Sequence, residues 1–458
     1  MFEFGRELKR LFGADAVRAP RDGLTGGDAS LLELLDLRMI SQEGRAADIA
    51  AGRVGAKDKA QRRLEAAIVW REVARRSGDA TILRKAAATA EAAAEAFGRE
   101  RRPDGWARAR CEQAFCAMLG AELFGDEGLN AAADVAFREA RAAARGGLAL
   151  PLADIGVAAI EAREQMGLLD ARAARAAFQR LAAPIVALQN LTRRCRAARL
   201  LAVEARLVAA DIMIGWGARL RDIDILALGR DEAARAADGL DPAYEPLSWA
   251  RACALRGQAM ALIGEASGEV EPLAKAVTAL ADVAGELSRE HSPLDWARVQ
   301  TALAQGLQAL GEAGASERAY EQAVTCYDRA AHVLKTAPGL SLRAFGASNR
   351  ALCLARSAEL SGDLTVLDAA EAAFKIELAD ISARRDPAAW ALLQVNLARL
   401  YEARLDITGQ DRGERASAAM ALNAALDVFG ELGLRSLCVI AADALERLAG
   451  PATARPAY

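Results

Sequence analysis

The sequence has few of the residues that favour β-strands. Aromatic side chains make up only 5% of its 458 residues and β-branched side chains are scarce, whereas the hydrophobic share of 53% consists mostly of alanine and leucine. Alanine and leucine are strong helix formers. The 12 prolines and 37 glycines fall mostly between periodic segments. The composition therefore predicts an all-α fold, and the length allows two or three compact domains or one extended array.

The sequence also lacks the motifs that catalytic and metal sites usually require. It has two histidines, no HExxH or Walker A motif, and no CxxC pair among its seven cysteines. The stretch "LTGGDAS" has no lysine and follows no expected strand, and Cys326 and His332 fall on different faces of one expected helix. We therefore expect a non-catalytic protein without a metal or cofactor. The alternative, an unrecognised helical enzyme, requires a deep enclosed pocket lined by ionisable groups.

The charge balance gives no sign of a nucleic-acid partner. The net charge is −3 and the isoelectric point is about 5.8, and the arginine-rich runs at 98–110 and 192–199 are typical of solvated helix faces. The N-terminus does not resemble a secretory signal, and no apolar run reaches the roughly 18 residues of a transmembrane helix. Scattered cysteines are typical of small core residues in a reducing compartment. We expect a cytoplasmic protein.

Four tryptophans recur at the start of similar segments. Each of them stands three residues after a proline and directly before an alanine: Trp106, Trp249, Trp296 and Trp390. Their separations of 143, 47 and 94 residues are close to multiples of 47, and such regularity is typical of a helical array. The spacing predicts eight units beginning near residues 55, 103, 151, 198, 246, 293, 338 and 387.

Each unit is expected to contain two helices. The first, helix A, begins at the proline, which suits a first helical turn, and is expected to end at a Gly or Gly-Asp such as Gly311. The second, helix B, carries one apolar stripe, as in the segment 315–335. A single stripe must pack against neighbouring units to be buried. The sequence thus predicts an α-solenoid of about eight antiparallel helix pairs with a period near 47 residues.

These units resemble the tetratricopeptide (TPR) repeat superfamily over roughly residues 55–431. The matching positions are Trp296, Leu303, Ala304, Leu307 and Gly311 in helix A, and Ala323, Tyr327 and Ala330 in helix B. The closest similarity is to bacterial TPR proteins with a "W-A-x-x-Q-x-x-L-G" run, of which "WARVQTALA" and "WALLQVNLA" are the nearest copies here. The period of 47 exceeds the standard 34, so a HEAT-like array, with periods of about 40–47, is the structural alternative.

The resemblance implies a concave groove lined by the A helices that binds a peptide or protein segment. Arginine and glutamine in a row could bind the carboxylates and amides of an extended segment. Carried over to this chain, the groove positions stand two and nine residues after the tryptophans: Arg108, Arg251, Arg298, Gln258, Gln305 and Arg399. The alternative is that these side chains form the solvated face of each A helix. The four tryptophans are interpreted as packing residues between repeats.

The remaining segments flank the array. Residues 1–13 place Phe4 and Leu8 on one face and predict an amphipathic helix, residues 14–30 a flexible linker, and residues 31–54 an N-terminal helix or cap with Asp28 or Ser30 as its N-cap. The repeat array is expected over 55–433, a capping helix over 434–450 and a tail over 451–458.

The sequence therefore predicts a scaffold or adaptor that binds another protein in the groove of its solenoid. In the second hypothesis the solenoid is regulatory, and its N-terminal amphipathic helix either occupies the groove or contacts a partner or membrane surface weakly. The partner is expected to be a protein or peptide segment and not a nucleic acid.

Overall fold

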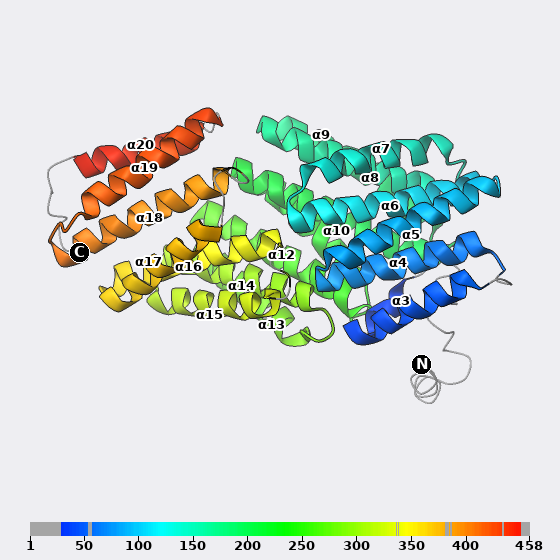
Figure 1. Ribbon diagram of the computed structural model, residues 1–458, viewed down its shortest axis with the longest axis horizontal. Coiled ribbons are helices and arrows are strands. Elements are labelled where there is room, and N and C mark those ends of the chain that lie inside the picture. Colours follow the sequence, from blue (N-terminus) through cyan, green and yellow to red (C-terminus); the bar gives the residue numbers. More distant parts are fainter. Residues whose placement is uncertain are drawn as a thin grey trace. The chain divides into compact units, whose positions relative to one another are not determined.

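The computed structural model describes residues 29–53, 57–335, 337, 339–380, 384, 387–432 and 435–449, and every regular element within them is a helix (Figure 1). The predicted amphipathic helix at 1–13, nearly all of the linker and the tail at 451–458 lie outside these residues. The all-α prediction is confirmed.

Eight helix pairs follow one another along the described chain. Their A helices are α4 (Lys59–Ser77), α6 (Pro103–Phe124), α8 (Ala149–Gln165), α10 (Ala197–Leu220), α12 (Pro246–Ser267), α14 (Pro293–Gly314), α16 (Ser341–Ser361) and α18 (Pro387–Thr408). Their B helices are α5 (Ala80–Arg99), α7 (Glu127–Ala143), α9 (Ala171–Leu191), α11 (Ile223–Asp238), α13 (Val270–Glu286), α15 (Glu317–Leu334), α17 (Leu364–Asp380) and α19 (Glu414–Glu431). The predicted number of pairs and the period near 47 are confirmed.

Four further elements complete the described chain. The 3₁₀ helix η1 (Ser30–Leu34) and helix α3 (Leu37–Gly52) precede the first pair, η2 (Met166–Leu168) follows α8, and α20 (Arg435–Ala449) packs on α19. The sequence predicted one continuous helix after Asp28 or Ser30. The structure instead breaks it at Leu35, whose backbone is extended, and α3 is capped by Asp36, whose carboxylate accepts a hydrogen bond from the Met39 amide at 2.7 Å.

The turns within pairs stop one helix and start the next with two adjacent residues. Gly78 and Gly125 adopt left-handed φ angles of 71° and 68°, which glycine tolerates at no steric cost. The aspartates that follow, Asp79 and Asp126, accept hydrogen bonds from the first amides of α5 and α7. The Gly-Asp stop seen in the sequence is therefore also the start signal of helix B.

The glycines near the ends of helix A have a different role from the one predicted. Gly311 and Gly264 do not end their helices but lie inside the last turn or two of α14 and α12. A Cβ atom at Gly264 would lie 2.8 Å from Cγ of Leu273 and 3.1 Å from its backbone nitrogen, and one at Gly311 would lie 3.0 Å from the Tyr320 ring. These glycines let the first turn of helix B approach helix A closely.

This close approach predicts opposite effects for two glycine substitutions. Gly264→Ala is expected to lower the free energy of unfolding by about 1–3 kcal/mol, because the added methyl group must displace the backbone of α13. Gly285→Ala, where no described atom lies within 4 Å of the added Cβ, should stabilise the protein by up to about 1 kcal/mol through helix propensity. Urea denaturation of the two variants measures both effects. Equal midpoints would contradict the proposed role of Gly264.

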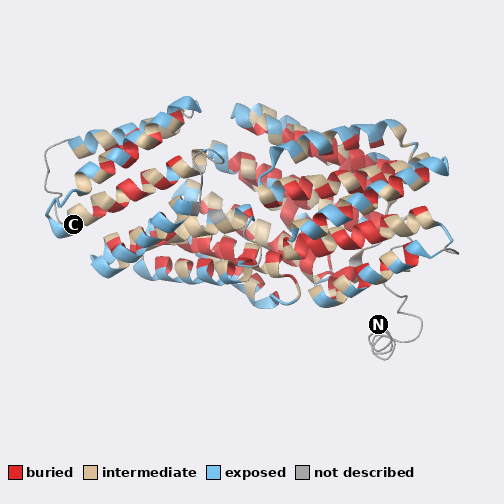
Figure 2. Cartoon of the chain, viewed as in Figure 1, coloured by how far each residue is buried: buried red, intermediate tan, exposed pale blue. Residues whose placement is uncertain are grey.

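Two compact units divide the chain. Unit 1 comprises residues up to Gly306 together with His332–Ser341, and unit 2 comprises Leu307–Ala331 together with the residues from Leu342 on. In each unit the buried residues line the contacts between neighbouring helices (Figure 2). The largest core cluster, in unit 1, runs from α6 to α11 and contains Phe137 and Trp216, both fully buried. In unit 2, Phe374 of α17 and Phe429 of α19 are fully buried in B helices, as Phe137 is in α7.

The cysteines are free thiols, and five of the seven are buried. Burial raises the pKa of Cys111 to about 12 and also raises the pKa of Cys116, so both stay protonated and weakly nucleophilic at neutral pH. This agrees with their interpretation as small core residues. No helix in the described ranges combines the length and apolar character needed to cross a membrane.

Candidate functional site

The A helices of unit 1 turn charged side chains toward one another, and these form a buried ionic cluster at the C-terminal half of α4. The guanidinium of Arg75 donates to both carboxylate oxygens of Asp295 on α14, at 2.9 and 2.7 Å, and to Glu72 at 2.6 and 2.8 Å. Arg75 is 6% and Asp295 1% exposed, so the pair is shielded from water. Since 220 residues separate the two partners, unit 1 turns back on itself at this point.

Electrostatics around Asp295 favour its ionised form. Burial opposes ionisation, but Arg75, then Arg251 and Arg298, together with the Ser292 hydroxyl that donates at 2.7 Å, hold the pKa of Asp295 below its ordinary value. Burial likewise opposes the charge of Arg75, but Asp295 and Glu72 hold the pKa of Arg75 above its usual range. A cation and an anion therefore face each other as a stable charged pair.

A second part of the ionic cluster links α4 to α6. Arg71 donates to the fully buried carboxylate of Glu112 at 2.5 Å, and its guanidinium lies 5.6 Å from the centre of the Phe115 ring. Arg108 stands 3.5 Å from the other oxygen of Glu112, an ion pair without hydrogen-bond geometry. Arg108 is thus largely buried beside this carboxylate.

The other two predicted arginines of unit 1 are engaged as well. Arg298 pairs with Glu122 of α6 and lies 3.8 Å from Asp295, while Arg251 donates to the Ser248 hydroxyl at 3.0 Å. The Nε atom of Arg251 is buried and has no hydrogen-bond partner among the described residues. Burial, together with the neighbouring guanidinium of Arg75, lowers the pKa of Arg251. The structure therefore does not present Arg108, Arg251 and Arg298 as an open row of unpaired side chains.

The predicted glutamines differ from the arginines. Gln258 and Gln305 are half-buried on α12 and α14, seven residues after Arg251 and Arg298 and hence on the same helix faces. Neither side chain makes a hydrogen bond with the described part of the chain. Arg399 lies apart from these residues, on α18 of unit 2, where burial and the nearby Arg356 lower its pKa. The structure therefore brings five of the six predicted residues into unit 1 and leaves Arg399 in unit 2.

The four recurring tryptophans are half-buried at the first turns of their helices. Trp249 and Trp296 contact one core cluster formed by α10 to α14, Trp106 contacts the cluster of α6 to α11, and Trp390 contacts that of α18 to α20. Their predicted role between repeats stays a prediction, to which these positions conform.

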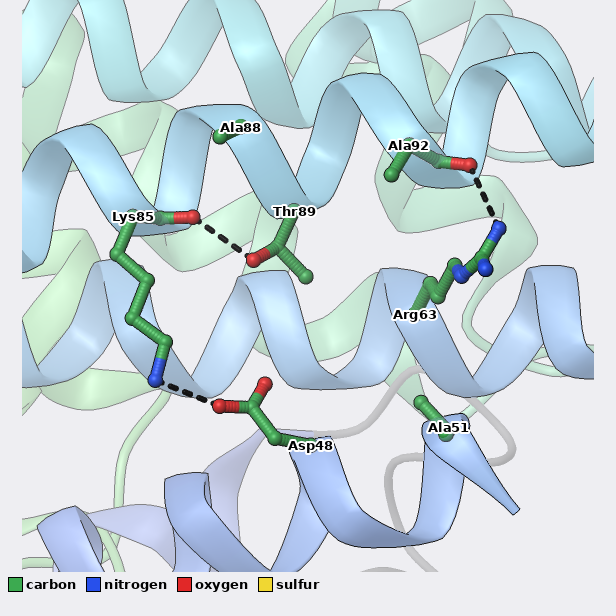
Figure 3. Close-up of a pocket in the computed structure, with 8 residues that line it drawn as sticks. Asp48, Ala51, Arg63, Lys85, Ala88, Thr89 and Ala92 are labelled. Carbon is green, nitrogen blue, oxygen red and sulfur yellow. Dashed lines mark hydrogen bonds and ion pairs between the residues drawn. The ribbon is translucent and has the colours of Figure 1, made fainter.

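A shallow hollow lies between α3, α4 and α5 (Figure 3). Its charged groups satisfy one another: Lys85 pairs with Asp48 at 2.6 Å and lies 3.6 Å from the centre of the Trp70 ring, and Arg63 donates to the Ala92 carbonyl at 3.4 Å. No group of metal-ligating side chains occurs in the described ranges. The stronger candidate is thus the ionic cluster together with two helix faces: the face of α12 that carries Arg251 and Gln258, and the face of α14 that carries Arg298 and Gln305. These two faces are called the inner face.

Comparison with known proteins adds likenesses of fold. No protein family matches this chain, and no curated protein matches it. Solved structures with similarity to this chain include the following two. A Rap protein in complex with competence and sporulation factor has 11% identity and a TM-score of 0.48, over 86% of this chain and 98% of that one. A circular tandem repeat protein with novel repeat topology and enhanced subunit contact surfaces has 17% identity and a TM-score of 0.29, over 89% and 96%. Likenesses at this level carry no functional information.

Sequence reasoning did not find several residues of the site. Arg75 and Arg76 looked like ordinary cations at the end of a helix, which favour the helix dipole. A signal was present, because Arg76 continues the apolar positions Val69 and Val73 at helical spacing, and the structure buries it completely. Glu33 within "LLELLDL" carried the same signal: a charge inside an apolar stretch.

Proposed function

We propose that the chain is a TPR-like scaffold that binds a segment of a partner protein on the inner face of unit 1. The observation that carries the proposal is the pair Gln258 and Gln305, two half-buried polar side chains without hydrogen-bond partners among the described residues, on the same helix faces as Arg251 and Arg298 and two turns further along. Amide side chains can donate to and accept from the backbone of an extended segment. A purely structural face would gain more from apolar residues at these positions.

The pattern of the helix pairs supports a TPR-like architecture over a HEAT-like one. TPR repeats carry an Ala-x3-Phe pattern in helix B. Here five B helices bury an alanine and, four residues on, an aromatic ring: Ala93 and Phe97, Ala133 and Phe137, Ala323 and Tyr327, Ala370 and Phe374, and Ala425 and Phe429. The glycines near the ends of α6, α10, α12 and α14 each face the first turn of the following helix B.

Site-specific photo-crosslinking in the native cells tests the proposal. A photo-reactive amino acid at Gln305 on the inner face is compared with one at Thr278, an exposed position of α13. A discrete crosslinked protein at position 305 that is absent at 278 is the expected result. A double variant then changes Gln258 and Gln305 to glutamate, so its photo-reactive amino acid replaces Arg256 instead. We expect this variant to lose at least nine-tenths of the crosslinked product. Identical products at both positions would contradict the proposal.

Glutamines are the better choice for this test than the arginines. Reversing Arg298 would place a carboxylate beside Glu122 and Asp295, so loss of a partner could follow from loss of structure. The change of a glutamine without partners to glutamate alters the charge of the inner face and breaks no described hydrogen bond. A cytoplasmic, non-catalytic role belongs to the same proposal, which assigns recognition but no chemistry to the inner face.

A further inference from the structure

The short helix η1 is bound by the repeat array as a peptide ligand would be. Its Glu33 is 5% exposed, and the carboxylate caps the N-terminus of α12 by accepting from the amides of Leu247 and Ser248, each at 2.9 Å. The Ser248 hydroxyl donates to the same carboxylate. Leu32 and Leu35, on either side of the glutamate, are 1% and 4% exposed.

Side chains of the array also recognise the backbone of this segment. Arg76 of α4 donates to the Leu35 carbonyl at 2.6 Å and to the Leu32 carbonyl at 2.9 Å. His291, just before α14, lies with Nε2 2.5 Å from the Glu33 carbonyl oxygen. Since a carbonyl only accepts, this nitrogen carries the proton. Arg76 of α4, the N-terminus of α12 and His291 just before α14 therefore bind both the backbone and the carboxylate of one short segment.

Cationic groups lie close to the carboxylate of Glu33. Arg75, Arg76 and Arg251 face Glu72 and Asp295, Glu204 also acts on Arg251, and the N-terminus of α12 adds a partial positive charge. Burial raises the pKa of Glu33, while Arg251 and the hydrogen bonds from Ser248 oppose this shift. The remaining buried Nε of Arg251 offers a donor that η1 does not use.

The connections of η1 allow it to leave without unfolding its neighbour. Leu35 is extended and α3 has its own cap at Asp36, so the helical hydrogen bonds of α3 do not continue into η1. The backbone contact from the Leu37 amide to the Glu290 carbonyl is long, at 3.5 Å. The segment is thus a separate element that is tethered to the site.

We propose that Arg76, Ser248, His291 and the N-terminus of α12 form a recognition site for a short acidic segment of a partner protein, flanked by leucines, and that Glu33 with Leu32 and Leu35 occupies this site within the chain. A second copy of the chain would offer the same contacts as the tethered segment and gain nothing over it. A foreign segment can displace η1 if it makes additional contacts, for example a second carboxylate that pairs with Arg251. This recognition site is separate from the inner face that carries Gln258 and Gln305, and the proposal does not depend on the proposed function of that face.

A synthetic peptide of residues 28–38, "DASLLELLDLR", tests the site directly. In the full chain, the double substitution Leu32→Ser and Glu33→Lys weakens the tethered segment, and binding of the fluorescent peptide is followed by anisotropy. The variant should bind the peptide at least tenfold more tightly than the wild-type chain, where the tethered segment competes at an effective concentration in the millimolar range. A peptide with glutamine in place of the glutamate should bind the variant at least tenfold more weakly. A folded variant that binds neither peptide would overturn the proposal.

Amide hydrogen exchange on the wild-type chain gives an independent measurement that does not depend on the folding of the variant. If η1 leaves its site, the Leu247 and Ser248 amides lose their acceptor while α12 stays folded. We expect these two amides to exchange at least tenfold faster than the amides in the middle of α12. Exchange only together with the middle of α12 would show that η1 cannot be displaced, and would also overturn the proposal.

Discussion

Replacing Asp295 with alanine is expected to lower the free energy of unfolding of unit 1 by about 3–5 kcal/mol, the largest effect of any single polar substitution that we predict. The substitution leaves the guanidinium of Arg75 buried at 6% exposure with only Glu72 as a partner, and a buried charge that has lost its counter-ion is costly. Urea denaturation followed by circular dichroism measures the loss.

The matched control removes both charges. In the double variant Arg75→Met and Asp295→Leu, apolar side chains of similar volume replace the pair, and we expect most of the lost stability to return. Glu271→Ala, which breaks an exposed pair with Lys275 on α13, should leave the midpoint unchanged. If Asp295→Ala behaves like Glu271→Ala, the buried pair does not stabilise the fold.

Asp295 also predicts the direction of a pH dependence. Its folded pKa lies below the ordinary value of 3.8, so the unfolded chain takes up this proton first as the pH falls. The stability that Asp295 contributes is therefore complete above the unfolded pKa and is lost as the pH decreases below about 4. The difference in urea midpoint between wild type and Asp295→Ala should shrink over the same range.

Trp216→Ala is expected to cost about 3–5 kcal/mol, because it removes the largest fully buried side chain of the protein as described. The indole fills the contact between α8 and α10, and its Nε1 donates to the Ala162 carbonyl at 3.2 Å. Thermal denaturation of the variant should show a lower midpoint and, because of the cavity, binding of small apolar molecules that raises it again.

Two further variants separate packing from the hydrogen bond. Trp216→Phe retains most of the buried area and should cost less than the alanine variant, although it leaves the Ala162 carbonyl without its donor. Trp296→Ala removes a half-buried ring and should cost less than Trp216→Ala. If Trp296→Ala proves the more destabilising, the recurring tryptophans are more important to the array than their exposure indicates.

The architecture could be predicted because it repeats. The spacing of the Pro-x-x-Trp starts placed the A helices at Pro103, Pro246, Pro293 and Pro387, where the structure has them. Where no Pro-x-x-Trp motif marked the start, the predicted positions near 55, 151 and 338 differed by a few residues from the observed starts at Lys59, Ala149 and Ser341. Helix ends depend on the loops and caps of each pair, and these do not repeat.

The candidate site could be predicted only in part, because it depends on contacts between distant segments. The resemblance to TPR repeats implied groove positions for Arg251 and Arg298 but could not reveal that Asp295, Ser248 and Glu122 contact them. The break at Leu35 could not be read locally either, since "LLELLDLR" is a good helical sequence. Contacts with Arg76 and the N-terminus of α12 hold Glu33 and its neighbours in a separate element.

The contact between α4 and α14 changes how unit 1 should respond to stress. An open helical array frays from its ends, since each pair depends only on its neighbours. In unit 1 the first pair is held to the N-terminal half of α14 by Arg75 and Asp295, and η1 ties the same region to α12. The first pair therefore cannot detach alone, and we infer that the first five pairs and this half of α14 lose their structure in one cooperative step. Such long-range contacts also raise the contact order, so unit 1 should fold more slowly than an open array of the same length.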